Sequence, residues 1–248
     1  MSYPAPPVGA GWSPVSPPAP PAPVELPAPF ADRQGRNPFV AYFSTWKLAL
    51  IEPQKFFAHV RLNQSGAALL FALCTFVSVS ILQALFAAAY LSQMQAVFRQ
   101  MGTTLPPEVA QLFQSVGAVG PALLLVGAVA GVVADFVVLF TMAAVLHLLL
   151  LLFRAGGRGF DATLTVVGYS TGLALIGLVP CGGFVALVWL PIVLIIGLAA
   201  AHRTTRGKAA AAVLAPGVLL VFCCCMGGSM MAGALKGLIP QHGGGTTL

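Results

Sequence analysis

The sequence predicts an all-α, polytopic membrane protein: a five-helix transmembrane bundle preceded by amphipathic helices at the membrane interface. Hydrophobic residues make up 58% of the 248 positions and charged residues 7%, and the mean hydropathy is +0.92. A soluble domain carries roughly 25% charged residues, so a soluble enzyme, a nucleic-acid-binding domain and a disordered regulator are disfavoured. Five apolar blocks approach or exceed the about 20 residues that cross a bilayer. The twelve lysines and arginines all lie outside these blocks.

Residues 1–36 are predicted to form a disordered, proline-rich cytosolic tail. Eleven of the first 29 residues are proline, which fixes φ, lacks an N–H group and favours extended, solvated chain. The alternative function for this tail is a ligand that docks into a proline-binding partner domain.

Residues 37–62 are predicted to form amphipathic helices that lie in the membrane interface. Asn37 and Pro38 make a good helix start, with a capping side chain before a proline at the first helical position. Aromatic and basic side chains just before an apolar span are typical of the headgroup layer. The alternative is that these helices pack against the protein's own bundle. The predicted interfacial anchors are Trp46, Lys47, Phe56, Phe57 and Arg61.

Residues 63–238 are predicted to hold the five transmembrane helices, since a helix satisfies every backbone polar group in lipid. The expected spans are 66–91, 121–153, 162–179, 183–200 and 209–235. The second block would be about 50 Å long as one helix, so it tilts, protrudes, or splits near Asp135. Residues 93–119 are expected outside the membrane with a short surface helix, and residues 239–248 form a mobile polar end.

Charge counting favours five spans, with the N-terminus inside and the C-terminus outside. This topology places ten lysines and arginines on the inner side and two, Arg99 and Lys236, on the outer side. Cytoplasmic loops carry such a positive excess, whereas splitting the second block would move two of the ten outside. The basic residues nearest the later spans are predicted to set topology and contact lipid headgroups. They are Arg154, Arg158, Arg203, Arg206 and Lys208.

Polar side chains within the spans define a candidate intramembrane polar site. Asp135 lies near the middle of the second span, where a charge costs about 2.5–3.5 kcal/mol, so it should face the bundle interior. It is either a proton or cation site, or a carboxyl group hydrogen-bonded to serine or threonine on neighbouring helices. His147 lies about 18 Å further along that helix, too far for a dyad, and is expected to bond a neighbouring helix near the inner headgroups. The full set is Asp135, His147, Tyr169, Ser170 and Thr171.

No catalytic residue, metal site or cofactor is predicted. The sequence contains no HExxH motif, no evident Ser/His/Asp set and no paired carboxylates. The glycine-rich segment 154–159 lacks the preceding strand and the lysine of a phosphate-binding loop, and is interpreted as a basic turn. His202, which precedes Arg203, is expected at the cytosolic face.

The order of several short motifs resembles the Yip family (Ypt-interacting protein domain), in its bacterial form. Trp46, Pro53, Phe56 and Phe57 resemble the W-x6-P-x2-FF stretch that opens that domain. His147 with the following leucines and Gly156–Gly157 resembles its HLxL…GG stretch. Later elements continue the resemblance as far as about residue 220, through Phe160, Val167, Gly168, Tyr169, Ser170, Leu187, Trp189, Ile195, Ile196, Gly197, Leu198, His202 and Pro216.

The resemblance implies a small α-helical membrane domain with its N-terminus in the cytosol. Eukaryotic members of the family bind Rab-type GTPases and shape trafficking membranes, but their DLYGP-like stretch has no clear counterpart here. The Ala/Gly/Pro-rich composition resembles that of a high-GC bacterium, which implies the cytoplasmic (inner) membrane. The expected function is non-enzymatic: membrane organisation, or a scaffold for membrane or cytosolic protein partners or for further copies of itself. The alternative is a proton or small-solute transporter or channel that uses Asp135 and the polar third span.

Overall fold

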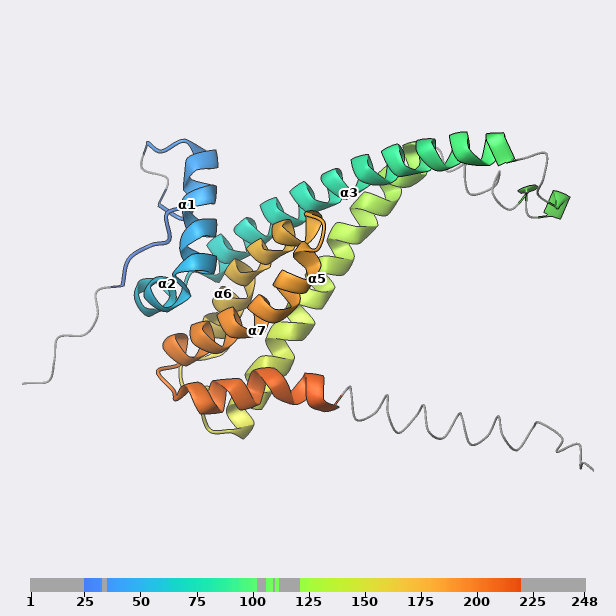
Figure 1. The fold of residues 1–248 in the computed structure, drawn as a ribbon. Coiled ribbons are helices and arrows are strands. Elements are labelled where there is room, and N and C mark those ends of the chain that lie inside the picture. The colour runs from blue at the N-terminus through green and yellow to red at the C-terminus, as the bar shows by residue number, and fades with distance from the viewer. Residues whose placement is uncertain (1–24, 33–34, 102–105, 109, 112–120, 220–248) are drawn as a thin grey trace, which may run out of the picture.

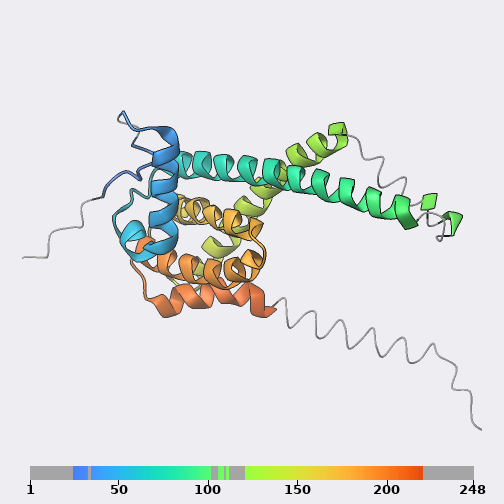
Figure 2. The ribbon, with the colours of Figure 1, turned by 45° about the horizontal axis from the view of Figure 1, so that its top comes forward.

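The computed structural model describes residues 25–32, 35–101, 106–108, 110–111 and 121–219. Their regular structure is helical: α1 (Pro38–Ile51), α2 (Pro53–His59), α3 (Ser65–Met101), α5 (Pro121–Leu152), α6 (Phe160–Ser170), the 3-10 helix η1 (Thr171–Leu178) and α7 (Gly182–Ala201). A further helix covers 206–219. The long helices lie side by side, while α1 crosses one end of the bundle (Figures 1 and 2).

The start of α1 follows the local sequence signal. The Asn37 side chain accepts a hydrogen bond from the Phe39 N–H at 2.9 Å, and Pro38 occupies the first helical position. Pro53 then begins α2, because proline lacks the N–H group that a continuing helix needs but is tolerated in a first turn. The chain therefore turns between α1 and α2 at Glu52.

Four of the described helices are long and apolar enough to cross a membrane: Ser65–Met101, Leu124–Leu152, Phe160–Leu178 and Gly182–Ala201. α5 is one helix with no break at Asp135, so the second predicted block does not split. α3 extends ten residues beyond the predicted end of the first span at residue 91. Of the fifth predicted span, 209–235, only residues up to 219 are described, so the count of five stays a prediction.

α6 is the central helix of the bundle and packs on α3, α5 and α7. Every residue from Ala162 to Ser170 is buried. Gly168 permits the close approach to α3, because an added Cβ would lie 3.0 Å from the Ala68 Cβ and 3.1 Å from its carbonyl oxygen. Small residues at such crossings let helix backbones meet in membranes.

The outward faces of the long helices are apolar. Leu125, Val133 and Leu148 on α5, with Leu187 and Val188 on α7, are each at least 60% exposed. Exposed apolar surface on this scale is unfavourable in water but matches lipid tails. The bundle is therefore suited to contact with a lipid bilayer.

Residues 25–32, which we call the strap, pack against the bundle and lie within the segment predicted as a tail. Leu26 pairs with Val60 in a parallel bridge, and the Leu26 N–H donates to the His59 carbonyl oxygen at 2.6 Å. Ala28 and Phe30 are 2% and 5% exposed, respectively. In the described chain, packing against the bundle thus includes the strap, ahead of the boundary predicted at residue 36, because Ala28 and Phe30 reach the core.

Candidate functional site

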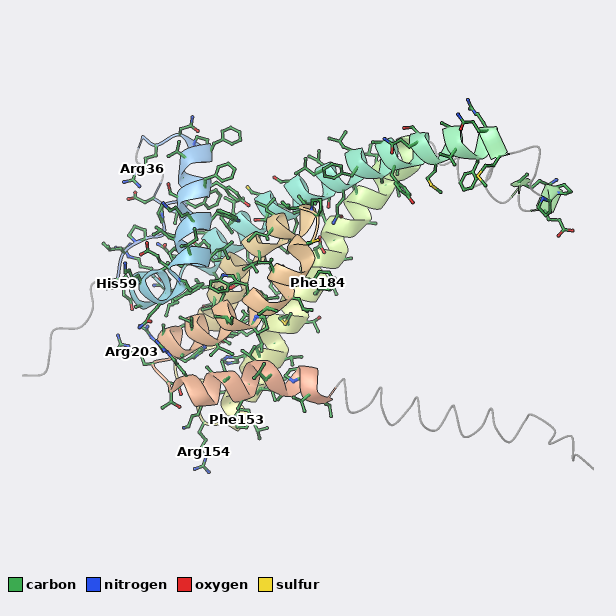
Figure 3. The ribbon with its side chains drawn as sticks, in the orientation of Figure 1. Arg36, His59, Phe153, Arg154, Phe184 and Arg203 are labelled. Atoms are coloured by element: carbon green, nitrogen blue, oxygen red, sulfur yellow. The ribbon has the colours of Figure 1, made fainter. Side chains whose placement is uncertain are left out.

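Four segments meet at one end of the bundle, which we call the inner end: the strap, α2 and the turns at 153–159 and 202–205. The Arg158 guanidinium pairs with the Glu25 carboxylate at 2.6 Å, and Arg206 donates to the Gln54 side-chain oxygen at 2.9 Å. Figure 3 shows Arg154 and Arg203 at this end, away from Phe184. These are segments that charge counting assigned to the inner side.

Two tryptophans fasten α1 to the bundle. The Trp46 indole N–H donates to the Gly172 carbonyl oxygen of η1 at 2.8 Å. The Trp189 indole N–H of α7 donates to the Leu50 carbonyl oxygen at the end of α1, also at 2.8 Å. Both bonds link residues more than 120 positions apart. α1 is therefore packed against the bundle through specific bonds, as the alternative prediction required.

The predicted interfacial anchors divide between the core and the surface. Phe56 and Phe57 are buried in the hydrophobic core, and Trp46 is half-buried against it. These three side chains are packing residues of the bundle, and their role as interfacial anchors stays a prediction. An aromatic stripe has the same spacing whether it faces lipid headgroups or neighbouring helices. Lys47 and Arg61 are exposed, and their anchoring role stays a prediction.

A hydrogen-bonded cluster of two histidines and one threonine lies at the inner end. Thr163 on α6 has its hydroxyl oxygen 3.0 Å from Nδ1 of His147 on α5 and 2.9 Å from Nε2 of His202, which follows α7. The two imidazole centroids are 6.0 Å apart. Thr163 is fully buried and His202 is 5% exposed. The cluster joins three helices through a single hydroxyl group.

The electrostatic environment of His202 disfavours its charged form. Burial, then the nearby His147, then Arg158 lower the pKa of His202 to about 4, because each opposes a further positive charge. The Nδ1 atom of His202 is also buried and makes no hydrogen bond to a described residue. The imidazole of His202 is therefore neutral at pH 7.

Asp135 lies in a different place from the histidines. It lines a cavity of 380 Å³ with Ser170 and Thr171, and the other walls are largely apolar, as at Phe76 and Leu139. The Ser170 hydroxyl donates to the Val166 carbonyl oxygen at 2.8 Å and the Thr171 hydroxyl to the Gly168 carbonyl oxygen at 2.6 Å. Both hydroxyl protons are thus bonded within their own helical segment, which leaves their oxygens as acceptors toward the cavity.

The predicted intramembrane polar site is therefore divided among three locations. Asp135, Ser170 and Thr171 share one cavity. His147 bonds Thr163 of a neighbouring helix, as predicted. Tyr169 is 1% exposed, and its ring packs in a T-shaped contact 5.2 Å from Phe56, so it belongs to the aromatic core.

The five basic residues predicted for topology and lipid contact all flank the inner end. Arg158 and Arg206 make the bonds to Glu25 and Gln54 given above. The remaining three, Arg154, Arg203 and Lys208, are exposed. Within the described ranges no group of three or more His, Cys, Asp or Glu side chains is placed to hold a metal ion.

Sequence reasoning missed the grouping of His202 with Thr163 and His147, and it missed the strap. His202 lies at the inner end and is buried, and the adjacent Arg203 is exposed; the prediction that His202 lies at the cytosolic face stays a prediction. No local signal links positions 147, 163 and 202. The strap did carry a signal, because Leu26, Ala28 and Phe30 alternate with polar or proline residues as in a half-buried extended segment.

The fold and the inner end together define an α-helical, polytopic integral membrane protein with its N-terminal helices packed against its spans. A family model described as the Yip1 domain matches residues 47–227, well over half of the chain, from α1 to beyond the last described helix. The chain therefore belongs to the Yip1 domain family. No curated protein and no solved structure matches it.

Proposed function

We propose that this chain is a non-enzymatic Yip-type membrane protein that organises the membrane or holds partner proteins at its inner end. The observation that carries the proposal is the fixed position of the N-terminal segment. The strap, α1 and α2, which we call the platform, are held against the bundle by the Trp46–Gly172, Trp189–Leu50 and Arg206–Gln54 bonds. A platform fixed in this way presents one defined surface.

The outward surface of α1 supports a docking role. Phe39, Val40, Phe43 and Ile51 are each more than 55% exposed, and the exposed Lys47 lies among them. α1 is not one of the candidate spans, so this apolar stripe is available at the surface of the platform. Exposed apolar stripes with a basic residue are typical of surfaces that bind a partner or enter the headgroup layer.

The exposed cations support contact with anionic lipid on the same side. Arg154, Arg203 and Lys208 would then face the cytoplasmic leaflet, whose negative surface potential attracts basic segments by about 1 kcal/mol per residue. In this proposal the inner end faces the cytosol of a bacterial cell and the N-terminus lies inside. The side taken by the C-terminus depends on the fifth span.

Site-specific photocrosslinking in native membranes tests the docking role. A benzoyl-phenylalanine at Phe43 should give a discrete adduct with one protein, or with a second copy of this chain at twice its mass. The matched control is the same probe at Phe184 of α7, which is 76% exposed on a span and should give lipid adducts only. Identical lipid-only patterns at the two positions would remove the scaffold proposal.

The shared cavity of Asp135, Ser170 and Thr171 favours a transporter or channel as the second candidate function. A mid-span carboxyl group beside two hydroxyl oxygens is an arrangement that proton and cation pathways use. Purified protein in liposomes should then move protons or a solute, and Asp135→Asn should abolish the flux. Asp161→Asn, at an exposed acid on α6, is the control that should retain it. Absence of flux under proton, potassium and sodium gradients counts against this candidate.

A further inference from the structure

The number of hydrogens available for the two hydrogen bonds of Thr163 limits how the histidine cluster can be protonated. The two contacts to Thr163 need two hydrogens, and the hydroxyl supplies one. One imidazole must therefore donate an N–H and the other must accept, which is satisfied when both histidines are neutral. With both histidines neutral, the cluster joins α5, α6 and the end of α7 through hydrogen bonds alone.

An added proton has no acceptor in this arrangement. Whichever imidazole donates to Thr163, a charged His202 carries hydrogens on both ring nitrogens, and its buried Nδ1 makes no hydrogen bond to a described residue. A buried, unpaired N–H on a cation is strongly unfavourable. Opening of the junction would let water reach this N–H.

The charged groups on the neighbouring elements do not offset the charge of a protonated His202. His147 and Arg158 are the groups that act electrostatically on His202. The nearest elements also carry acids, but the Asp161 carboxylate accepts from the Ser65 hydroxyl, and the Glu52 carboxylate pairs with Lys55. The titratable and charged groups on the elements around this junction are Asp135 and His147 on α5; Arg154 and Arg158 in the following turn; Asp161 and Tyr169 on α6; Cys74, Tyr90 and Arg99 on α3; Glu25 and Asp32 on the strap; Glu52 before α2; Lys55 and His59 on α2; and Arg203, Arg206 and Lys208 after α7.

We propose that His147, Thr163 and His202 form a proton-binding site that opens the inner junction of α5, α6 and α7 when the pH falls. The ligand is a proton, and the open state binds it more tightly because the imidazole there is hydrated. Only two nitrogen ligands converge, and no third His, Cys, Asp or Glu joins them in the described chain. The cluster is therefore an incomplete site for a metal that prefers four ligands.

The size of the pH-dependent opening follows from the pKa of His202 in the closed and open states. With a His202 pKa of about 4 when closed and about 6.5 when hydrated, the opening constant should rise about 25-fold from pH 7.5 to 5.0. The reporters are the amide hydrogens of His202, Arg203 and Thr204, which bond to carbonyl oxygens at the end of α7. Their exchange rates report local opening once corrected for the intrinsic pH dependence of exchange.

The experiment is hydrogen exchange on the full chain in lipid nanodiscs at both pH values. His202→Gln keeps an N–H near the position of Nε2 but cannot titrate, so the 25-fold rise should shrink to less than threefold. His59→Gln is the matched control, because His59 is exposed on α2 and bonds the Lys55 carbonyl oxygen within its own helix; it should keep the full response. A wild-type change below threefold, or a full response in His202→Gln, overturns the proposal.

A second measurement covers the case in which His202→Gln does not fold. Nitrogen-15 labelling of the histidines in the wild-type protein reports the protonation of each imidazole directly. The His202 ring should remain neutral at pH 5.5, because burial, His147 and Arg158 lower its pKa to about 4. A His202 ring that is charged at pH 5.5 in the closed protein contradicts the proposal.

Discussion

Gly172→Ala is the sharpest test of whether α1 is docked on the bundle. An alanine Cβ at this position would lie 2.8 Å from Cδ1 of Trp46 and 3.4 Å from Cζ of Phe71. Contacts as close as 2.8 Å force the neighbouring ring to move, and overpacking of this kind costs about 1–3 kcal/mol. The shift would also strain the bond from the Trp46 indole N–H to the Gly172 carbonyl oxygen. We expect a loss of about 2 kcal/mol in the free energy of unfolding.

A double-mutant cycle with Trp46→Ala isolates this contact. Trp46→Ala alone should cost about 2–3 kcal/mol, below the range for a fully buried tryptophan because Trp46 is half-buried. In that background Gly172→Ala should cost less than about 0.5 kcal/mol, because the ring it would meet is gone. The assay is SDS-induced unfolding in mixed micelles, followed by far-UV circular dichroism so that the tryptophan change does not alter the probe.

A glycine on an open face of α5 provides the control for this double-mutant cycle. Gly127→Ala, on a face of α5 where an added Cβ meets nothing within 4 Å, should not destabilise the protein and should raise its stability by at most about 1 kcal/mol, because alanine favours a helix more than glycine does. If the stability losses of Trp46→Ala and Gly172→Ala simply add in the double variant, the Trp46 ring does not contact Gly172 of η1. That result would favour the interfacial position predicted for α1 over packing against the bundle.

Three further predictions concern the inner end. Thr163→Val should cost about 2–4 kcal/mol, because two buried imidazole nitrogens lose their common partner; the same micelle assay measures it, and a loss under 1 kcal/mol would contradict the bridging role. The pKa of His202 is lower in the folded state, about 4, than the about 6.5 of an unfolded histidine. As the pH falls, the unfolded state therefore takes up the proton first. The free energy of unfolding should be constant above pH 7 and fall by about 3 kcal/mol in total as the pH drops from 6.5 to 4. His202→Gln should remove most of this pH dependence. Glu25→Gln should cost less than about 1 kcal/mol and only at low salt, because the Glu25–Arg158 pair is partly exposed; limited proteolysis of the strap with and without salt measures it.

The helices were predictable because their signals are local. Apolar blocks of 18 residues or more and the Asn37–Pro38 start need only neighbouring positions to be recognised. The same holds for the turn before α7, where Cys181 has a φ of 64° and the Gly182 N–H bonds the Val179 carbonyl oxygen at 2.7 Å. The continuity of α5 through Asp135 also followed from the sequence, because the charge count disfavoured a turn there.

The choice of partner for each helix face was not predictable. Phe56 and Phe57 have the spacing of an interfacial stripe, yet they pack into the core with Phe71 and Tyr169. The sequence records only that these side chains avoid water, and lipid and protein interior satisfy that requirement equally well. The burial of His202 was unpredictable for the same reason. A polar residue beside an arginine at a helix end has the same sequence pattern whether its side chain is solvated or hydrogen-bonded across the bundle.

The polar bonds between elements explain why the inner end is the place to look for function. At the inner end of the described chain the elements are joined by Arg158–Glu25, Arg206–Gln54, Thr165–Leu62 and the Thr163 bridge. The bonds Trp46–Gly172, Trp189–Leu50 and Tyr42–Thr75 join α1 to the spans further along the bundle. Between α3 and α5 further along the bundle, contacts such as the Phe76–Phe136 ring pair are apolar. Directional bonds fix geometry, whereas apolar contacts tolerate sliding. A substitution at the inner end should therefore propagate through several elements, while a substitution such as Phe136→Leu should act only on its neighbours.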